Sequence, residues 1–175
     1  TEDDRTMIGN PNPDFIVGIN LNFSYKGFDF NLTGTGAFGQ QIAKSYRSFA
    51  DSPLQNYTTD IFGRWTGEGT SNKLPRLTSG SHTNWQNISD IYIEDGDYLK
   101  IQNVTLGYDF KKLFRNIPLG QARLYVTAQN LYTFTGYSGM DPEVGYGYDQ
   151  SWVSGIDLGY YPSPRTYLVG VNLKF

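Results

Sequence analysis

The first candidate for chemistry is a glycine-rich segment. Gly34, Gly36 and Gly39 have the G-x-G-x-x-G spacing that lets a backbone approach a pyrophosphate. The strand before such a site is buried on both faces and therefore continuously apolar. Here the preceding segment alternates, so Asp29 and Asn31 would have to be buried. We therefore interpret the glycines as the end of a strand where side chains become small, and we expect no cofactor.

Carboxylates cluster at two places. The first cluster consists of Asp90, Glu94, Asp95 and Asp97. An oxygen-rich loop can bind calcium, but the residue order of an EF-hand is absent here. We therefore expect a solvated loop, with calcium binding as the alternative. Asp141 and Glu143 flank a proline and could pair for acid–base work. No nucleophile accompanies them, and the proline favours a turn.

Other catalytic residue types are scarce. His82 is the single histidine, and the chain has no cysteine and no G-x-S-x-G motif. Triads and zinc sites need several such groups together. We expect no catalytic residue, no metal and no enzyme activity.

Aromatic side chains concentrate in the long connecting segments. Their faces can stack on sugars or cover peptides, and loops often carry function. The alternative, which we favour, is that they pack the loops against themselves or against a partner. The candidates for ligand or lid contact are Trp65, Trp85, Tyr137, Tyr146, Tyr148, Trp152, Tyr160 and Tyr161.

Five segments that alternate apolar and polar residues must position these loops. They are residues 15–24, 28–39, 98–110, 122–134 and 166–175. Each has 10–13 residues, whereas strands of soluble proteins have about 5–6 and tilted membrane strands about 9–11. The polar positions carry mostly Asn, Thr, Gln and Gly, which suits a water-filled lumen. The pattern predicts an all-β fold, a transmembrane antiparallel β-barrel.

Composition sets further limits. No apolar run is long enough for a membrane helix, while barrel strands need none. The net charge of −3 argues against a nucleic-acid partner. A soluble β-sandwich binding module and a passive porin or adhesin barrel remain alternatives.

The connections alternate in length. Residues 25–27 predict a tight turn, 111–121 a moderate link with a helical turn at 112–116, and 40–97 and 135–165 long loops. Barrels alternate short periplasmic turns with long external loops. Five strands cannot close a barrel, so we expect a piece of a larger one. Residues 54–66 and 85–93 are poor candidates for hidden strands.

The last segment ends on apolar residues at every second position. These residues resemble the C-terminal assembly signal of outer-membrane barrels: Tyr167, Val169, Val171, Leu173 and Phe175.

Longer motifs extend the resemblance. Residues 62–66 read FGRWT and are followed by Pro75-Arg76, residues 97–108 read DYLKIQNVTLGY, and residues 128–137 read AQNLYTFTGY and are followed by GMDPE at 139–143. Together with residues 162–165 (PSPR), they resemble the C-terminal part of SusC/RagA-type TonB-dependent transporters of Bacteroidota.

That resemblance implies a barrel of the 22-stranded type in the outer membrane of a Gram-negative cell, contacting its lipid. Residues 1–175 would be the last five strands, without the plug and TonB box. The whole would import bulky nutrients such as glycan oligomers or peptides. The implied partners are the rest of the barrel and plug, a SusD-like surface lipoprotein, and the TonB complex through the plug.

Overall fold

The computed structural model describes residues 5–46, 59–77, 89–114, 116, 118–143 and 154–175. The chain divides into two compact units. We call Asp14–Phe38, Asp97–Thr135 and Pro162–Phe175 the sheet unit. We call Thr1–Pro13, Gly39–Gly96 and Gly136–Tyr161 the loop unit.

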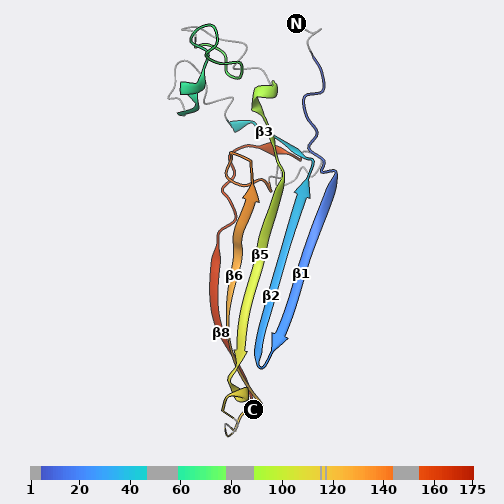
Figure 1. The fold of residues 1–175 in the computed structure, drawn as a ribbon, viewed down its shortest axis with the longest axis vertical. Helices are drawn as coiled ribbons and strands as arrows, with labels where there is room; N and C mark the ends of the chain where they lie inside the picture. Colours follow the sequence, from blue (N-terminus) through green and yellow to red (C-terminus); the bar gives the residue numbers. More distant parts are fainter. Residues whose placement is uncertain (1–4, 47–58, 78–88, 115, 117, 144–153) are drawn as a thin grey trace. The chain divides into compact units, whose positions relative to one another are not determined.

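The sheet unit is a five-stranded antiparallel sheet with the strand order β1-β2-β5-β6-β8 (Figure 1). Its strands are β1 (Phe15–Tyr25), β2 (Phe28–Phe38), β5 (Tyr98–Asp109), β6 (Gln121–Thr135) and β8 (Thr166–Lys174). Every end lies within one residue of the end that the alternation predicts. The predicted all-β class and the five long strands are confirmed.

Both short connections have local causes. Lys26 and Gly27 have φ values of 47° and 94°, so two left-handed residues join β1 to β2 as in a type I′ turn. The predicted tight turn is confirmed. After β5 the helical turn is a 3-10 helix, η4 (Phe110–Lys112), which starts two residues before the predicted one. The Asp109 carboxylate caps it, accepting from the Lys111 N–H at 3.0 Å.

A β-bulge explains why the alternation in β5 is clear only in its second half. Thr33 pairs with Asn103 and Gly34 with Ile101, which leaves Gln102 as an extra residue. An extra residue moves every following side chain to the opposite face. The apolar positions are therefore odd-numbered before the bulge (Leu99, Ile101) and even-numbered after it (Val104, Leu106, Tyr108).

The loop unit contains a small sheet that the alternation did not predict. Strand β3 (Gln41–Lys44) pairs antiparallel with β4 (Ile93–Asp95) and parallel with β7 (Ile156–Asp157). Ile42, Tyr92 and Tyr137 are buried there. The 3-10 helices η2 (Thr59–Gly63) and η3 (Asp90–Tyr92) belong to this unit. These strands of two to four residues are too short to show a period.

None of the helices in the described ranges is long and apolar enough to cross a membrane.

Candidate functional site

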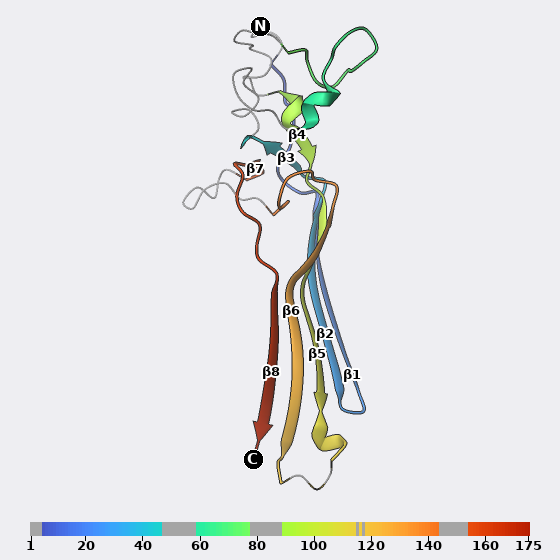
Figure 2. The same cartoon turned by 90° about the vertical axis from the view of Figure 1, so that its left-hand side faces the viewer.

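The sheet unit has two chemically different faces, because its register aligns like residues across all five strands. Turned by 90°, the five strands form one layer (Figure 2). One row, paired neighbour to neighbour, contains only apolar residues: Phe23, Phe30, Leu106, Val126 and Val169. Val126 is 47% exposed and Val169 is 75% exposed. A soluble sheet would bury such a row under a second layer.

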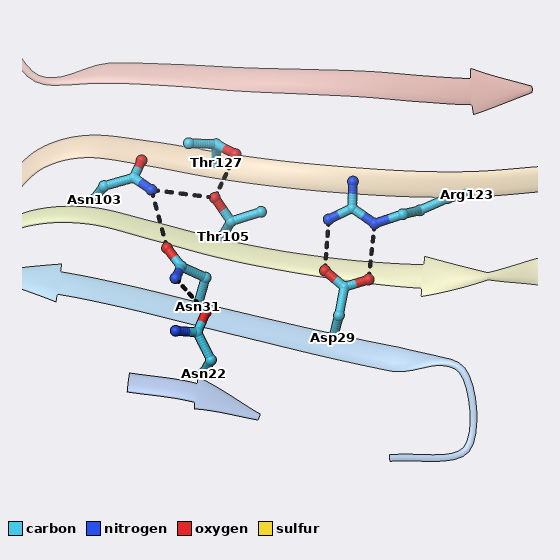
Figure 3. A network of polar contacts seen from close by, with 7 residues as sticks. All are labelled: Asn22, Asp29, Asn31, Asn103, Thr105, Arg123 and Thr127. Carbon is cyan, nitrogen blue, oxygen red and sulfur yellow. Dashed lines mark hydrogen bonds and ion pairs between the residues drawn. The ribbon is translucent and has the colours of Figure 1, made fainter. Parts of the chain in front are cut away.

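The opposite face carries a row of amides and hydroxyls that bond to one another across four strands (Figure 3). Asn31 donates through Nδ2 to Asn22 Oδ1 at 2.6 Å, and Asn103 Nδ2 lies 3.5 Å from Asn31 Oδ1. Thr105 and Thr127 share a hydrogen bond of 2.8 Å between their hydroxyls. The row satisfies many of its own groups while staying open to water.

A bidentate ion pair lies on the same face, nearer the β1–β2 turn (Figure 3). Arg123 Nε donates to Asp29 Oδ1 at 2.8 Å, and Nη2 donates to Oδ2 at 2.5 Å. The pair reaches from β6 to β2 across β5, over Gly107. A Cβ at Gly107 would lie 2.6 Å from Arg123 Nε and from Asp29 Oδ1. Only glycine leaves room for this fork-to-carboxylate geometry.

Tyr125 covers the next glycine in the same row. The Arg123 guanidinium carbon lies 4.7 Å from the centroid of the Tyr125 ring, which is cation–π contact. A Cβ at Gly170, the partner of Tyr125 on β8, would overlap that ring. The row thus alternates large and small residues from strand to strand.

In the loop unit, a charged network joins segments far apart in sequence. Lys44 Nζ donates to Glu94 Oε1 at 3.1 Å and to the Ser138 hydroxyl. The Ser138 N–H donates to Glu94 Oε2 at 2.9 Å. Burial alone would raise the pKa of Glu94, but the hydrogen bonds from Ser138 and Lys44 outweigh it, so this pKa is lowered.

A second contact in this unit is nearly excluded from water. The Tyr137 hydroxyl donates to Asp157 Oδ2 at 2.6 Å, and the Gly159 N–H donates to Oδ1 at 2.7 Å. Burial, followed by the contact with Asp157, raises the pKa of Tyr137. Tyr137 is 6% exposed, so it packs within the loop unit.

The other candidate residues are scattered. Trp65, Tyr160 and Tyr161 are exposed, Tyr161 most of all. The side chains with the proposed assembly role, which lie in β8 or directly after it, are all exposed, namely Tyr167, Val169, Val171, Leu173 and Phe175. Trp85, Tyr146, Tyr148, Trp152 and His82 lie outside the described residues.

One residue of the acidic cluster and two glycines of the glycine-rich segment make close contacts within the fold. Glu94 belongs to the Lys44 network, and within the described ranges no three His, Cys, Asp or Glu residues group as metal ligands do. Gly34 and Gly36 lie in β2, and Cβ atoms there would lie 2.8 Å from carbonyl oxygens of β5. Strand β3, not a helix, follows them, so the order of a dinucleotide site is missing.

Sequence reasoning missed the polar network and the Asp29–Arg123 pair. Their only signal was that opposite charges and several amides occupy the polar positions of alternating segments.

Comparisons with known proteins find relatives of this chain among TonB-dependent receptors. No protein-family model matches the chain. The chain is 37% identical to TonB-dependent receptor P3 and 31% identical to receptor P39 of Formosa agariphila, and 28% identical to TonB-dependent receptor SusC of Bacteroides thetaiotaomicron. Each alignment covers 98% of this chain but only 16–17% of the relative.

Solved structures give the same result. The RagAB peptide transporter matches 90% of the chain with a TM-score of 0.71 and 26% identity. The RagAB peptide importer in its closed-closed state matches 93% with a TM-score of 0.72 and 26% identity. This chain spans 17% of either matched chain. The similarity therefore concerns one segment of much longer proteins.

Proposed function

Because this chain is related over nearly its whole length to TonB-dependent receptors of the SusC/RagA type, we propose that it forms part of the wall of an outer-membrane importer. The observation that carries the proposal is the 98% alignment with receptor P3, onto a sheet whose apolar face is exposed. The cargo would be a bulky nutrient, a glycan oligomer or a peptide.

The two faces of the sheet would do different work. Lipid contact with the row containing Val126 and Val169 would replace the missing second layer, since hydrocarbon solvates exposed apolar side chains. The amide and hydroxyl row would line the lumen, where it offers hydrogen bonds without a strong field. This segment would form part of the barrel wall and would not itself drive transport.

The lengths of the connections then predict on which side of the membrane each connection would lie. The β1–β2 turn and the link containing η4 would face the periplasm, because they are short. The long connections, which leave the opposite strand ends, would face the exterior and meet a SusD-like lipoprotein. The plug and TonB box, through which the TonB complex would act, would lie elsewhere in the longer protein. Residues 1–175 would be one portion of its barrel.

Envelope fractionation tests this proposal. Antiserum against residues 118–135 should detect an outer-membrane protein much larger than this chain's 19.7 kDa, whose migration changes on boiling. Affinity purification in mild detergent should recover a surface lipoprotein with it. A soluble band of the size of this chain would overturn the proposal.

A passive porin would share the barrel and its location. Uptake that survives loss of TonB would favour it. The soluble β-sandwich alternative is weakened by the exposed apolar row, since a sandwich buries that face.

A further inference from the structure

Strand β6 extends beyond its neighbour β8 at the end of the sheet opposite the β1–β2 turn. Its pairing with β8 runs from Gln121 to Gln129, whereas its pairing with β5 continues to Thr135. Within the described part of the chain, residues 130–135 therefore have a neighbouring strand on one side only. We call the backbone of residues 131–134, on the side away from β5, the open edge. The proposed function makes no use of it.

Two prolines explain why β8 does not continue along the open edge. If the register of β6 and β8 were extended, Pro164 would lie opposite Leu131 and Pro162 opposite Thr133. Proline has no backbone N–H and cannot donate to a ladder between strands. The segment that leads into β8 is therefore unable to pair with the open edge as a regular strand.

A bulge in β6 directs the two segments apart. Asn130 has a φ of 51°, in the left-handed region, and its Nδ2 donates to the Pro164 carbonyl at 3.0 Å. Beyond this contact, the segment that leads into β8 and the end of β6 diverge (Figure 2). Within the described ranges, no backbone hydrogen bond reaches residues 131–134 from outside the pairing of β5 with β6. The edge thus keeps unpaired donors and acceptors.

The open edge lies beyond the part of the sheet that lipid would contact. Strand β8 has 9 residues and β6 has 15. A tilted strand crosses the hydrocarbon with about 9–11 residues, so β8 is just long enough to span it. Residues 131–134 would then extend past the bilayer on the side of the long connections. Unpaired backbone groups are tolerated there, because water or a ligand can satisfy them.

The chemistry of the edge matches an extended polypeptide. Backbone groups that face one side of a strand repeat every second residue, about 7 Å apart. A glycan has no backbone of alternating amide donors and acceptors, whereas a second strand does. Beside the edge, Tyr132 and Phe134 are 49% and 53% exposed, and their ring centroids lie 4.7 Å apart. These rings would pack against side chains of an added strand.

We infer that a short imported peptide binds at the open edge as an additional strand, by β-augmentation. Its side chains beside Tyr132 and Phe134 would be apolar, and those beside Thr133 would be polar. An edge of this length suits a free peptide better than a folded partner, whose specific interfaces take about 20–30 residues a side. The inference rests on the proposed function and narrows its cargo to peptides.

Calorimetric titration of the whole receptor, purified in detergent, tests the inference. The probe is a blocked pentapeptide of alternating threonine and valine. Two further versions carry N-methyl groups, one on the valines and the other on the threonines. Alternate N–H groups of a strand face opposite sides, so only one version loses the donors that face β6. That version should bind about tenfold more weakly, and the other should bind like the unmethylated peptide.

The double variant Pro162→Val, Pro164→Val tests the same edge from the side of the protein. Its restored N–H groups would let the segment before β8 pair with residues 131–134 and compete with the peptide. The apparent affinity should fall about tenfold. Pro118→Val, in the link before β6, is the matched control and should leave binding unchanged. A heat-modifiable band shows that the barrel of each variant is intact.

Other outcomes overturn the inference. Equal loss from both methylated versions would refute backbone pairing, and a double variant that binds like the wild type would refute this edge. Displacement of the peptide by maltotriose would refute the narrowing to peptides. Peptide binding only after the surface lipoprotein is removed would assign the edge to a partner protein. A receptor that reaches the outer membrane without binding the peptide refutes the inference alone, whereas one absent from that membrane refutes the proposed function.

Discussion

At the residue scale, glycines make room for the large side chains of the polar face. Gly107 lies beneath the Asp29–Arg123 pair, and Gly170 lies beneath the Tyr125 ring. Neither glycine has a positive φ, so close approach and not backbone freedom explains them. A larger residue would displace a contact across strands.

Gly170→Ala should lower the free energy of unfolding by about 1–3 kcal/mol, because its Cβ overlaps the Tyr125 ring. Chemical denaturation of the whole receptor in detergent micelles measures this. Gly18→Ala is the control, since no atom lies within 4 Å of a Cβ there. In a Tyr125→Ala background the cost should largely disappear, and a cost that persists would contradict the overlap.

The Glu94 network predicts a pH dependence of the loop unit. The pKa of Glu94 is lowered on folding, so its contribution to stability is present above the ordinary value of 4.5 and is lost as pH falls through the lowered pKa. Hydrogen exchange at β3 and β4, corrected for intrinsic rates, should therefore accelerate below about pH 4.5. Glu94→Gln should show a weaker pH response, and an unchanged response would contradict the assignment.

At the element scale, the two faces of each strand should tolerate charge differently. Val126→Arg places a cation on the proposed lipid face and should cost about 2–4 kcal/mol near mid-bilayer. Gln129→Arg, on the polar face of the same strand, should cost little. The amount of heat-modifiable receptor in the outer membrane measures both. Equal loss from both variants would contradict the assignment of the faces.

The strand limits followed from local sequence, but the bulge did not. Alternation is a property of neighbouring residues, so the ends of β1, β2, β6 and β8 could be read directly. Gln102 is an extra residue only in the register of β5 against β2, whereas against β6 the extra residue lies in β6, between Gln129 and Tyr132. Similarly, β3 and β7 are defined by pairing residues more than 100 positions apart.

At the scale of the whole molecule, the sheet has two edges, β1 and β8, that pair with one strand each. Unpaired backbone groups are not tolerated in lipid, so further strands are needed there. The isolated 175-residue chain should therefore sediment as aggregate in buffer without detergent. Analytical ultracentrifugation tests this, and a monodisperse folded chain would contradict the barrel.

The sequence by itself determined the all-β class, the five long strands, the two faces and the resemblance to SusC/RagA-type receptors, because each depends on residues close together in the chain. Only the tertiary structure decided that Arg123 pairs with Asp29 across an intervening strand, that Tyr137 is buried against Asp157, and that Lys44 pairs with Glu94. These contacts join distant residues, and several arrangements satisfy the same alternation. Register and loop packing select one of them, and local sequence does not specify either.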